Sequence, residues 1–124
     1  MKHILFALPV LVAGLAVGAA AHAADPAAGQ AIFKQQCSIC HSVVAGKNMT
    51  GPSLFGVVGR KSGTEAKFHY SAANKADGLT WDEATLDKYL TAPQQVVPHT
   101  TMTYGGLKDA TKRANLIAYL ATLH

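Results

Sequence analysis

The chain has 124 residues, which is enough for one small domain and little more. Its formal net charge is +4, and its basic residues are scattered rather than gathered in a stripe or cluster. This distribution excludes a nucleic-acid-binding protein, which presents a concentrated basic surface. It is compatible with soluble partners of acidic character.

Residues 1–23 are typical of a secretory signal peptide. Lys2 supplies a positive start, residues 4–21 form an uncharged apolar run, and Ala-His-Ala ending at Ala23 places small residues where a signal peptidase reads them. A run of this length can also anchor a protein in a bilayer. However, it is rich in Ala and Gly, and no positive cluster follows it. We therefore expect cleavage after Ala23, which leaves ten Lys and Arg against seven Asp and Glu, a net charge of +3.

The mature domain, residues 24–124, is predicted to begin with a helix over residues 26–36. Asp25 is suited to cap this helix and Pro26 to occupy its first turn. Gly29 and Phe33 lie four residues apart and therefore share one face. A glycine on that face allows another helix to approach closely.

A long irregular segment, residues 42–67, is predicted next. It is interrupted repeatedly by glycine, which argues against both a helix and a continuous strand. Loops of this length are unusual in a compact domain. Wrapping a bulky cofactor would account for this one.

Three further helices are predicted in the second half of the chain. A short one covers residues 71–76, and a second opens at Thr80, where a Glu three residues later forms an apparent capping box, and ends before Pro93. After a loop over residues 91–107, the last helix covers residues 108–123. No segment alternates with period two, so the mature domain is predicted to be all-α.

The motif Cys37-Ser38-Ile39-Cys40-His41 has the form C-x-x-C-H and contains both cysteines of the chain. Two thiols separated by one helical turn can each form a thioether with one haem vinyl group, and the histidine that follows can ligate the iron. A disulfide closing so short a loop would constrain little of the unfolded chain. A thioredoxin-like centre requires a βαβ framework, and a zinc site requires four ligands. Covalent haem at Cys37 and Cys40, with His41 on the iron, is therefore the favoured interpretation.

Met102 is the candidate for the sixth iron ligand. Haem iron in electron carriers commonly takes a methionine opposite the histidine. Met49 is too close to His41 in the sequence to reach the opposite face without a tight detour. Met102 lies far from the motif, in a polar, Thr-rich loop where a methionine would fill a core poorly.

The mature chain resembles the class I c-type cytochromes, the mitochondrial-type and bacterial soluble cytochrome c family. The resemblance covers Gly29 to Leu123. In family order, the matching segments are C-S-I-C-H, G-P-S-L-F-G-V-V-G-R, Y-S-A-A-N-K-A-D-G-L-T-W, Y-L-T-A-P, M-T-Y-G-G-L and L-I-A-Y-L. It implies a small cytochrome c fold, in which the N- and C-terminal helices pack together and long loops wrap one covalent haem c.

The resemblance also implies a function. The protein would be a periplasmic monohaem one-electron carrier rather than an enzyme, with its iron ligated by His41 and Met102. It would be a monomer that docks transiently with electron donor and acceptor proteins in the membrane or periplasm, and it would not bind nucleic acid. The competing class is a haem enzyme or gas sensor with an open distal site. Met102, and the lack of a distal His/Arg pair, argue against that class.

Further residues around the haem follow from the resemblance. Pro52 matches the proline whose carbonyl accepts a hydrogen bond from the proximal imidazole, and Tyr89 matches the tyrosine that hydrogen-bonds near the methionine sulfur. The matches to positions around the haem propionates and an internal water are Arg60, Tyr70, Asn74 and Trp81. The matches to the contact between the first and last helices are Gly29, Phe33, Leu116 and Tyr119.

The chain departs from the family at the rim of the haem site. Members that dock on large respiratory complexes usually surround the haem edge with lysines. Lys108 remains, but the other corresponding positions hold Gln36, Gln94, Gln95 and Thr101. A strongly basic docking face is therefore not expected. His99 stands where the family usually has glycine, and we expect it to face solvent.

Overall fold

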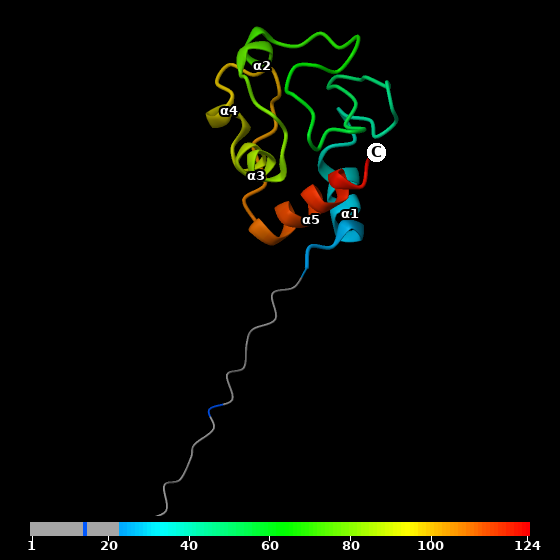
Figure 1. The fold of residues 1–124 in the computed structure, drawn as a ribbon, viewed down its shortest axis with the longest axis vertical. Helices are drawn as coiled ribbons and strands as arrows, with labels where there is room; N and C mark the ends of the chain where they lie inside the picture. Colours follow the sequence, from blue (N-terminus) through cyan, green and yellow to red (C-terminus); the bar gives the residue numbers. More distant parts are fainter. Residues whose placement is uncertain (1–13, 15–22) are drawn as a thin grey trace, which may run out of the picture.

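The computed structural model describes residue 14 and residues 23–124, and this part of the chain folds into helices joined by long loops (Figure 1). The helices are α1 (Pro26–Gln36), α2 (Ala72–Ala76), α3 (Glu83–Thr91), α4 (Pro93–Val96) and α5 (Ala110–Ala121). The described residues contain no strand, only an isolated antiparallel bridge between Lys61 and Thr80. The all-α fold expected from the sequence is confirmed.

The predicted signal peptide lies outside the described residues, apart from Gly14 and Ala23, so its cleavage site stays a prediction. None of the helices that the structure describes is long and apolar enough to cross a membrane. The start of the predicted mature domain is tied to α5, because the Asp25 backbone N–H donates to Asn115 Oδ1 over 2.8 Å.

The first and last helices, α1 and α5, pack against each other, as expected (Figure 1). Gly29 is buried where they cross, and a Cβ at this position would collide with the backbone carbonyl of Asn115. Phe33 packs beside Tyr119, with ring centroids 5.7 Å apart. The absence of a side chain at Gly29 thus sets how closely the two helices approach.

Helix α3 completes the core beside this pair. Arg113 on α5 forms an ion pair with Asp87 on α3, with Nε and Oδ1 2.6 Å apart, and donates to the Leu107 carbonyl over 2.9 Å. This contact holds α3 against α5. The buried apolar side chains that the two helices contribute are Leu86, Tyr89, Leu90, Leu116, Ile117 and Leu120.

The predicted start of α3 is wrong. Thr80 lies two residues before the helix cap and pairs with Lys61 in the isolated bridge instead. The N-cap is instead Asp82, whose Oδ1 accepts from the Thr85 backbone N–H over 2.7 Å. Glu83 is consequently the first helical residue and not the third position of a capping box.

The other helices agree with the prediction at least in part. The helix over residues 26–36 has the predicted bounds, and the predicted helix over residues 71–76 is α2 with Ser71 as its N-cap. The last helix begins at Ala110 rather than at residue 108. The short helix α4 was not predicted and lies inside the segment 91–107 that was expected to be a loop.

Candidate functional site

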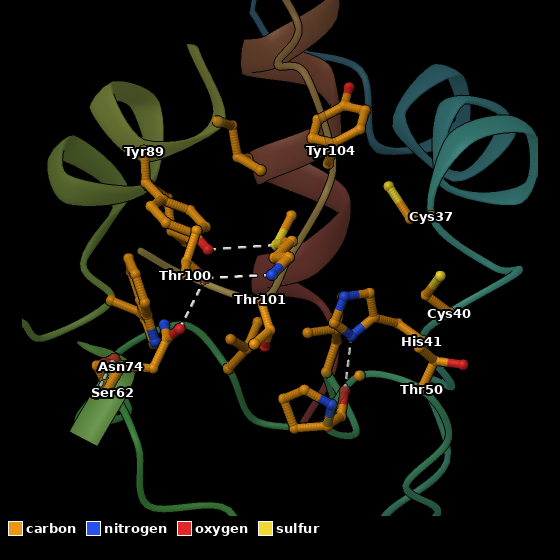
Figure 2. Close-up of a pocket in the computed structure, with 18 of the residues that line it drawn as sticks. Cys37, Cys40, His41, Thr50, Ser62, Asn74, Tyr89, Thr100, Thr101 and Tyr104 are labelled. Carbon is orange, nitrogen blue, oxygen red and sulfur yellow. Dashed lines mark hydrogen bonds between the residues drawn. The ribbon is translucent and has the colours of Figure 1, made fainter. Parts of the chain in front are cut away.

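A cavity of about 310 Å³ lies among α3, α5 and the loops, and its lining includes part of the long segment 42–67. All four predicted site residues line this cavity: Cys37, Cys40, His41 and Met102. Figure 2 shows the two cysteines and His41 on one side, and Tyr89, Thr100 and Asn74 on the other. The lining also includes the aliphatic side chains of Ile39, Leu54, Val57, Leu86, Leu90, Leu116 and Leu120.

The imidazole of His41 is held in a single orientation. Its Nδ1 lies 2.8 Å from the Pro52 carbonyl oxygen, which can only accept, so Nδ1 carries the proton and donates. Gly51 packs against the ring, and a Cβ there would collide with it. Burial lowers the pKa of His41, the hydrogen bond to Pro52 raises it, and the charge of Arg60 lowers it further. The ring is therefore neutral, and the lone pair of Nε2 is available to a metal.

The two cysteines are free thiols, not a disulfide. Burial, and secondarily the neighbouring Cys40, raises the pKa of the Cys37 thiol to about 11. A thiol-exchange centre needs a lowered pKa, so this environment contradicts the thioredoxin-like alternative. Within the described part of the chain, no group of three or more His, Cys, Asp or Glu side chains is placed to hold a metal ion.

Met102 is fixed from two sides. The Tyr89 hydroxyl lies 3.2 Å from the Met102 sulfur, in the contact that the family resemblance implied. The amide of Gln94 donates to the carbonyl oxygens of Met102 and Tyr104 over 2.8 and 2.9 Å. Sequence reasoning noted Gln94 only as a missing lysine and did not predict this role. The other methionine within residues 24–124, Met49, is 42% exposed and does not line the cavity.

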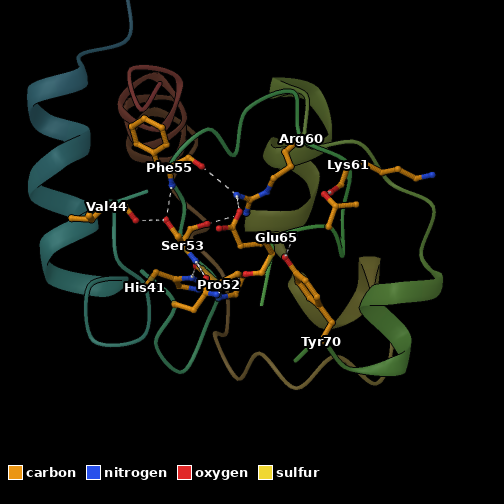
Figure 3. A network of polar contacts seen from close by, with 12 residues as sticks. His41, Val44, Pro52, Ser53, Phe55, Arg60, Lys61, Glu65 and Tyr70 are labelled. Atoms are coloured by element: carbon orange, nitrogen blue, oxygen red, sulfur yellow. Dashed lines mark hydrogen bonds and ion pairs between the residues drawn. The ribbon is translucent and has the colours of Figure 1, made fainter. Parts of the chain in front are cut away.

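A polar cluster forms another part of the cavity wall (Figure 3). Arg60 donates from Nη1 to Glu65 Oε2 over 2.9 Å and to the Phe55 carbonyl over 3.2 Å, and from Nη2 to the Ser53 carbonyl over 3.0 Å. Its Nε is buried and has no partner within the described residues. The Tyr70 hydroxyl accepts from the Glu65 backbone N–H over 3.0 Å. Arg60 therefore contributes a cationic side chain with one unpartnered donor to the wall of the cavity.

The remaining predicted residues fall in two groups. Four residues expected near the propionates line the cavity: Arg60, Tyr70, Asn74 and Trp81. Asn74 Oδ1 accepts a hydrogen bond from Thr100 Oγ1 over 2.7 Å, which connects α2 to the loop that carries Met102. His99 is exposed and does not line the cavity, as expected, and its φ of 66° lies in the region that favours glycine.

The sequence model of the cytochrome c family matches residues 26–124. The chain therefore belongs to this family of c-type cytochromes, and the resemblance inferred from its motifs is confirmed. It is 53% identical to cytochrome c2 of Rhodomicrobium vannielii over 114 residues, which cover 90% of each chain. It is 48% identical to cytochrome c2 of Rhodopila globiformis over 99 residues, covering 80% of this chain and 93% of that protein.

Solved structures agree with this assignment. The structure of cytochrome cH from Methylobacterium extorquens superposes with a TM-score of 0.74 at 43% identity, covering 79% of this chain and 98% of that one. As a member of the family, the protein carries one covalently attached haem c with its iron, and it transfers electrons rather than converting a substrate.

The residues present fit such a group. Two free thiols and a neutral imidazole lie on one side of a cavity with aliphatic walls, and a thioether sulfur also lines it. The unpartnered Nε of Arg60 is suited to an anionic substituent such as a haem carboxylate. Because Gly51 has no side chain, the His41 ring has room to pack against its backbone.

Proposed function

We propose that this protein is a periplasmic one-electron carrier whose haem iron is ligated by His41 and Met102, with thioether bonds to Cys37 and Cys40. The observation that carries the proposal is that all four side chains line one cavity and that the two proposed iron ligands are each held by a hydrogen bond. His41 is oriented by Pro52, and Met102 is held by Tyr89.

The residues around the cavity have a defined task in this function. When bound, the haem supplies one centre that gains or loses a single electron. The hydrogen bond from His41 to Pro52 fixes the ring and raises the basicity of Nε2. Gln94 and Tyr89 hold the loop of Met102 and would keep its sulfur in position to ligate the iron. The aliphatic lining excludes water.

The ligand assignment is tested by comparing Met102→Ala with Met49→Ala. Met102→Ala is expected to lose the sulfur-to-iron charge-transfer band of the oxidised protein and to bind carbon monoxide when reduced. Met49→Ala removes the other methionine of the mature chain and is expected to keep the band and exclude carbon monoxide. A band that survives in Met102→Ala would show that the sixth ligand is another group.

Export and maturation are tested separately. We infer that residues 1–23 are removed and that residues 24–124 form the mature cytochrome in the periplasm. Mass spectrometry of a periplasmic fraction is expected to find a chain that begins at Ala24 with one haem added. Ala23→Phe is expected to block cleavage, because the peptidase reads a small residue there. Ala20→Phe, outside the two positions read, is the matched control.

Docking partners are expected to approach the rim of the cavity. Its lining residues that are also exposed mark this rim, and they carry no charge: Ile39, Thr50, Thr101 and Thr103. Among the described residues, Ile39 is the most exposed large hydrophobic side chain, at 82%. We infer that transient docking of this monomer with donor and acceptor proteins relies on an uncharged contact with an apolar centre rather than on a ring of lysines.

A further inference from the structure

We propose that Glu65 lowers the midpoint potential of the haem by compensating the positive charge of Arg60. The proposal rests on the haem-binding function of the cavity. Glu65 does not line the cavity itself, so it acts through Arg60 and is a positioning residue.

The charges in the cavity wall are few. Among the residues that line it, Arg60 is the only Lys or Arg, and none is Asp or Glu. Lys61, the next residue along the chain, is exposed and extends away from this cluster in Figure 3. The guanidinium of Arg60 is consequently the dominant fixed charge that the cavity receives from its own wall.

Glu65 lies directly behind that charge. Its Oε2 is 2.9 Å from Arg60 Nη1, and both side chains are only 15% exposed. Counterions screen a pair at this depth less than they screen a surface pair. Both charges lie close to the wall, since the Glu65 backbone N–H donates to the hydroxyl of Tyr70, which lines the cavity. Burial is the largest cause of the raised pKa of Tyr70, and the charges of Arg60 and Glu65 act on this pKa in opposite directions, Arg60 lowering it and Glu65 raising it.

The position of Glu65 is maintained by its own backbone as well as by the ion pair. Its N–H donates to the Tyr70 hydroxyl, and Asn48 donates to the neighbouring Ala66 carbonyl over 2.9 Å. Asp77, a second carboxylate behind the wall, is already bonded to Ser62 Oγ and the Leu79 N–H. Glu65 is therefore the carboxylate in contact with the cationic group of the cavity.

The sign of the effect follows from charge. The ferric haem carries one more positive charge than the ferrous haem, so nearby cations favour the ferrous form and nearby anions the ferric form. An uncompensated Arg60 would raise the midpoint potential. Glu65, by opposing that charge, stabilises the oxidised form and lowers the potential.

The test compares Glu65→Gln with Glu83→Gln in the holoprotein. Gln has the size of Glu and keeps an oxygen that can accept from Arg60, so the cavity wall stays in place. Glu65→Gln is expected to shift the midpoint potential upward. Glu83→Gln makes the same chemical change at the exposed start of α3, and it is expected to leave the potential close to that of the natural chain.

Two further measurements separate a charge effect from a structural one. Glu65→Asp keeps the charge, and its potential is expected to stay near the natural value even if its shorter side chain reduces stability. Denaturation of both oxidation states is expected to show that Glu65→Gln destabilises the ferric form more than the ferrous form. An unchanged or lowered potential in Glu65→Gln would overturn the proposal. So would an upward shift of the same size in Glu65→Asp.

Failure of the haem assignment would look different. In that case the natural chain would itself lack a covalent haem or the expected low-spin spectrum, and the comparison among variants would have no potential to measure. A low-spin spectrum that is identical in all three variants, together with an unshifted potential, would overturn the role of Glu65 alone.

Discussion

The hydroxyl of Tyr89 donates a hydrogen bond to the sulfur of Met102 over 3.2 Å, joining α3 to the loop before α5. Burial raises the pKa of Tyr89, so the hydroxyl stays protonated near neutral pH and remains a donor. The side chains of Thr100 and Asn74 act on the same hydroxyl and lower its pKa. The sulfur proposed as the iron ligand therefore accepts a hydrogen bond from a buried phenol, which draws electron density from its lone pair.

Tyr89→Phe is expected to lower the midpoint potential. Without the hydrogen bond, the sulfur donates more strongly to iron, which stabilises the ferric form. A hydrogen bond has a net value of about 1 kcal/mol, which corresponds to a shift on the order of tens of millivolts for one electron. Voltammetry measures the shift. Tyr119→Phe makes the same change in the contact between α1 and α5 and is expected to leave the potential unchanged.

Gly51→Ala is expected to destabilise the proximal side of the haem. The new Cβ would overlap the His41 ring, which must then leave its hydrogen bond to Pro52. Overpacking of this kind costs about 1–3 kcal/mol. Denaturation of the holoprotein measures the loss, and the visible spectrum reports the altered ligation.

Gly105→Ala is the control for this substitution. A Cβ at Gly105 meets nothing within 4 Å, and its φ lies outside the positive region. Both variants add one methyl group to a loop that borders the cavity. Equal stability of the two would contradict the importance of the contact between Gly51 and His41.

Local signals predicted much of this molecule. The N-cap and the first-turn proline of α1 are adjacent residues, and the haem motif follows directly at the end of that helix. The helix and the motif could therefore both be predicted from one short segment of sequence. The family segments then placed Pro52 beside His41 and Tyr89 beside Met102, as the structure has them.

Tertiary pairing explains what the sequence did not predict. Thr80, where α3 was predicted to begin, instead pairs with Lys61, which lies in a separate loop. The clamp of Gln94 on Met102 depends on α4, a helix of four residues without a side-chain cap bond. The ion pair of Arg60 and Glu65 joins two irregular positions that no periodicity relates.

Gly29→Ala sets two physical effects against each other. Alanine favours a helix over glycine by about 1 kcal/mol, so propensity alone predicts a more stable protein. The Cβ would instead collide with the Asn115 carbonyl and lie 2.9 Å from Tyr119 Cβ, across the contact of α1 and α5. Because a backbone carbonyl cannot move aside cheaply, we expect a net loss of about 1–3 kcal/mol. A gain in the free energy of unfolding would contradict the close approach of the helices.

Ile39→Glu is expected to change how charged reagents exchange electrons with the protein. A carboxylate at the rim would slow oxidation by ferricyanide, an anion, and accelerate oxidation by a cationic cobalt(III) phenanthroline complex. Stopped-flow kinetics measure both rates. Val44→Glu is the matched control, because Val44 is 58% exposed but does not line the cavity. Equal effects of the two substitutions would mean that electrons do not leave at the rim around Ile39.

Asp82 is expected to make a pH-dependent contribution to the stability of α3. The hydrogen bonds from the Thr85 backbone N–H and then from its side chain hold the pKa of Asp82 below its ordinary value of 3.8. A depressed carboxyl pKa adds stability above the unfolded value, and that stability is lost as the pH falls through the folded value. The natural chain should therefore exceed Asp82→Asn in stability at neutral pH. The difference should begin to shrink as the pH falls toward 3.8 and should disappear only below the lower pKa of the folded state. Asp82→Ala, which also lacks the capping oxygen, should remain the least stable of the three throughout, as urea unfolding across this pH range would measure.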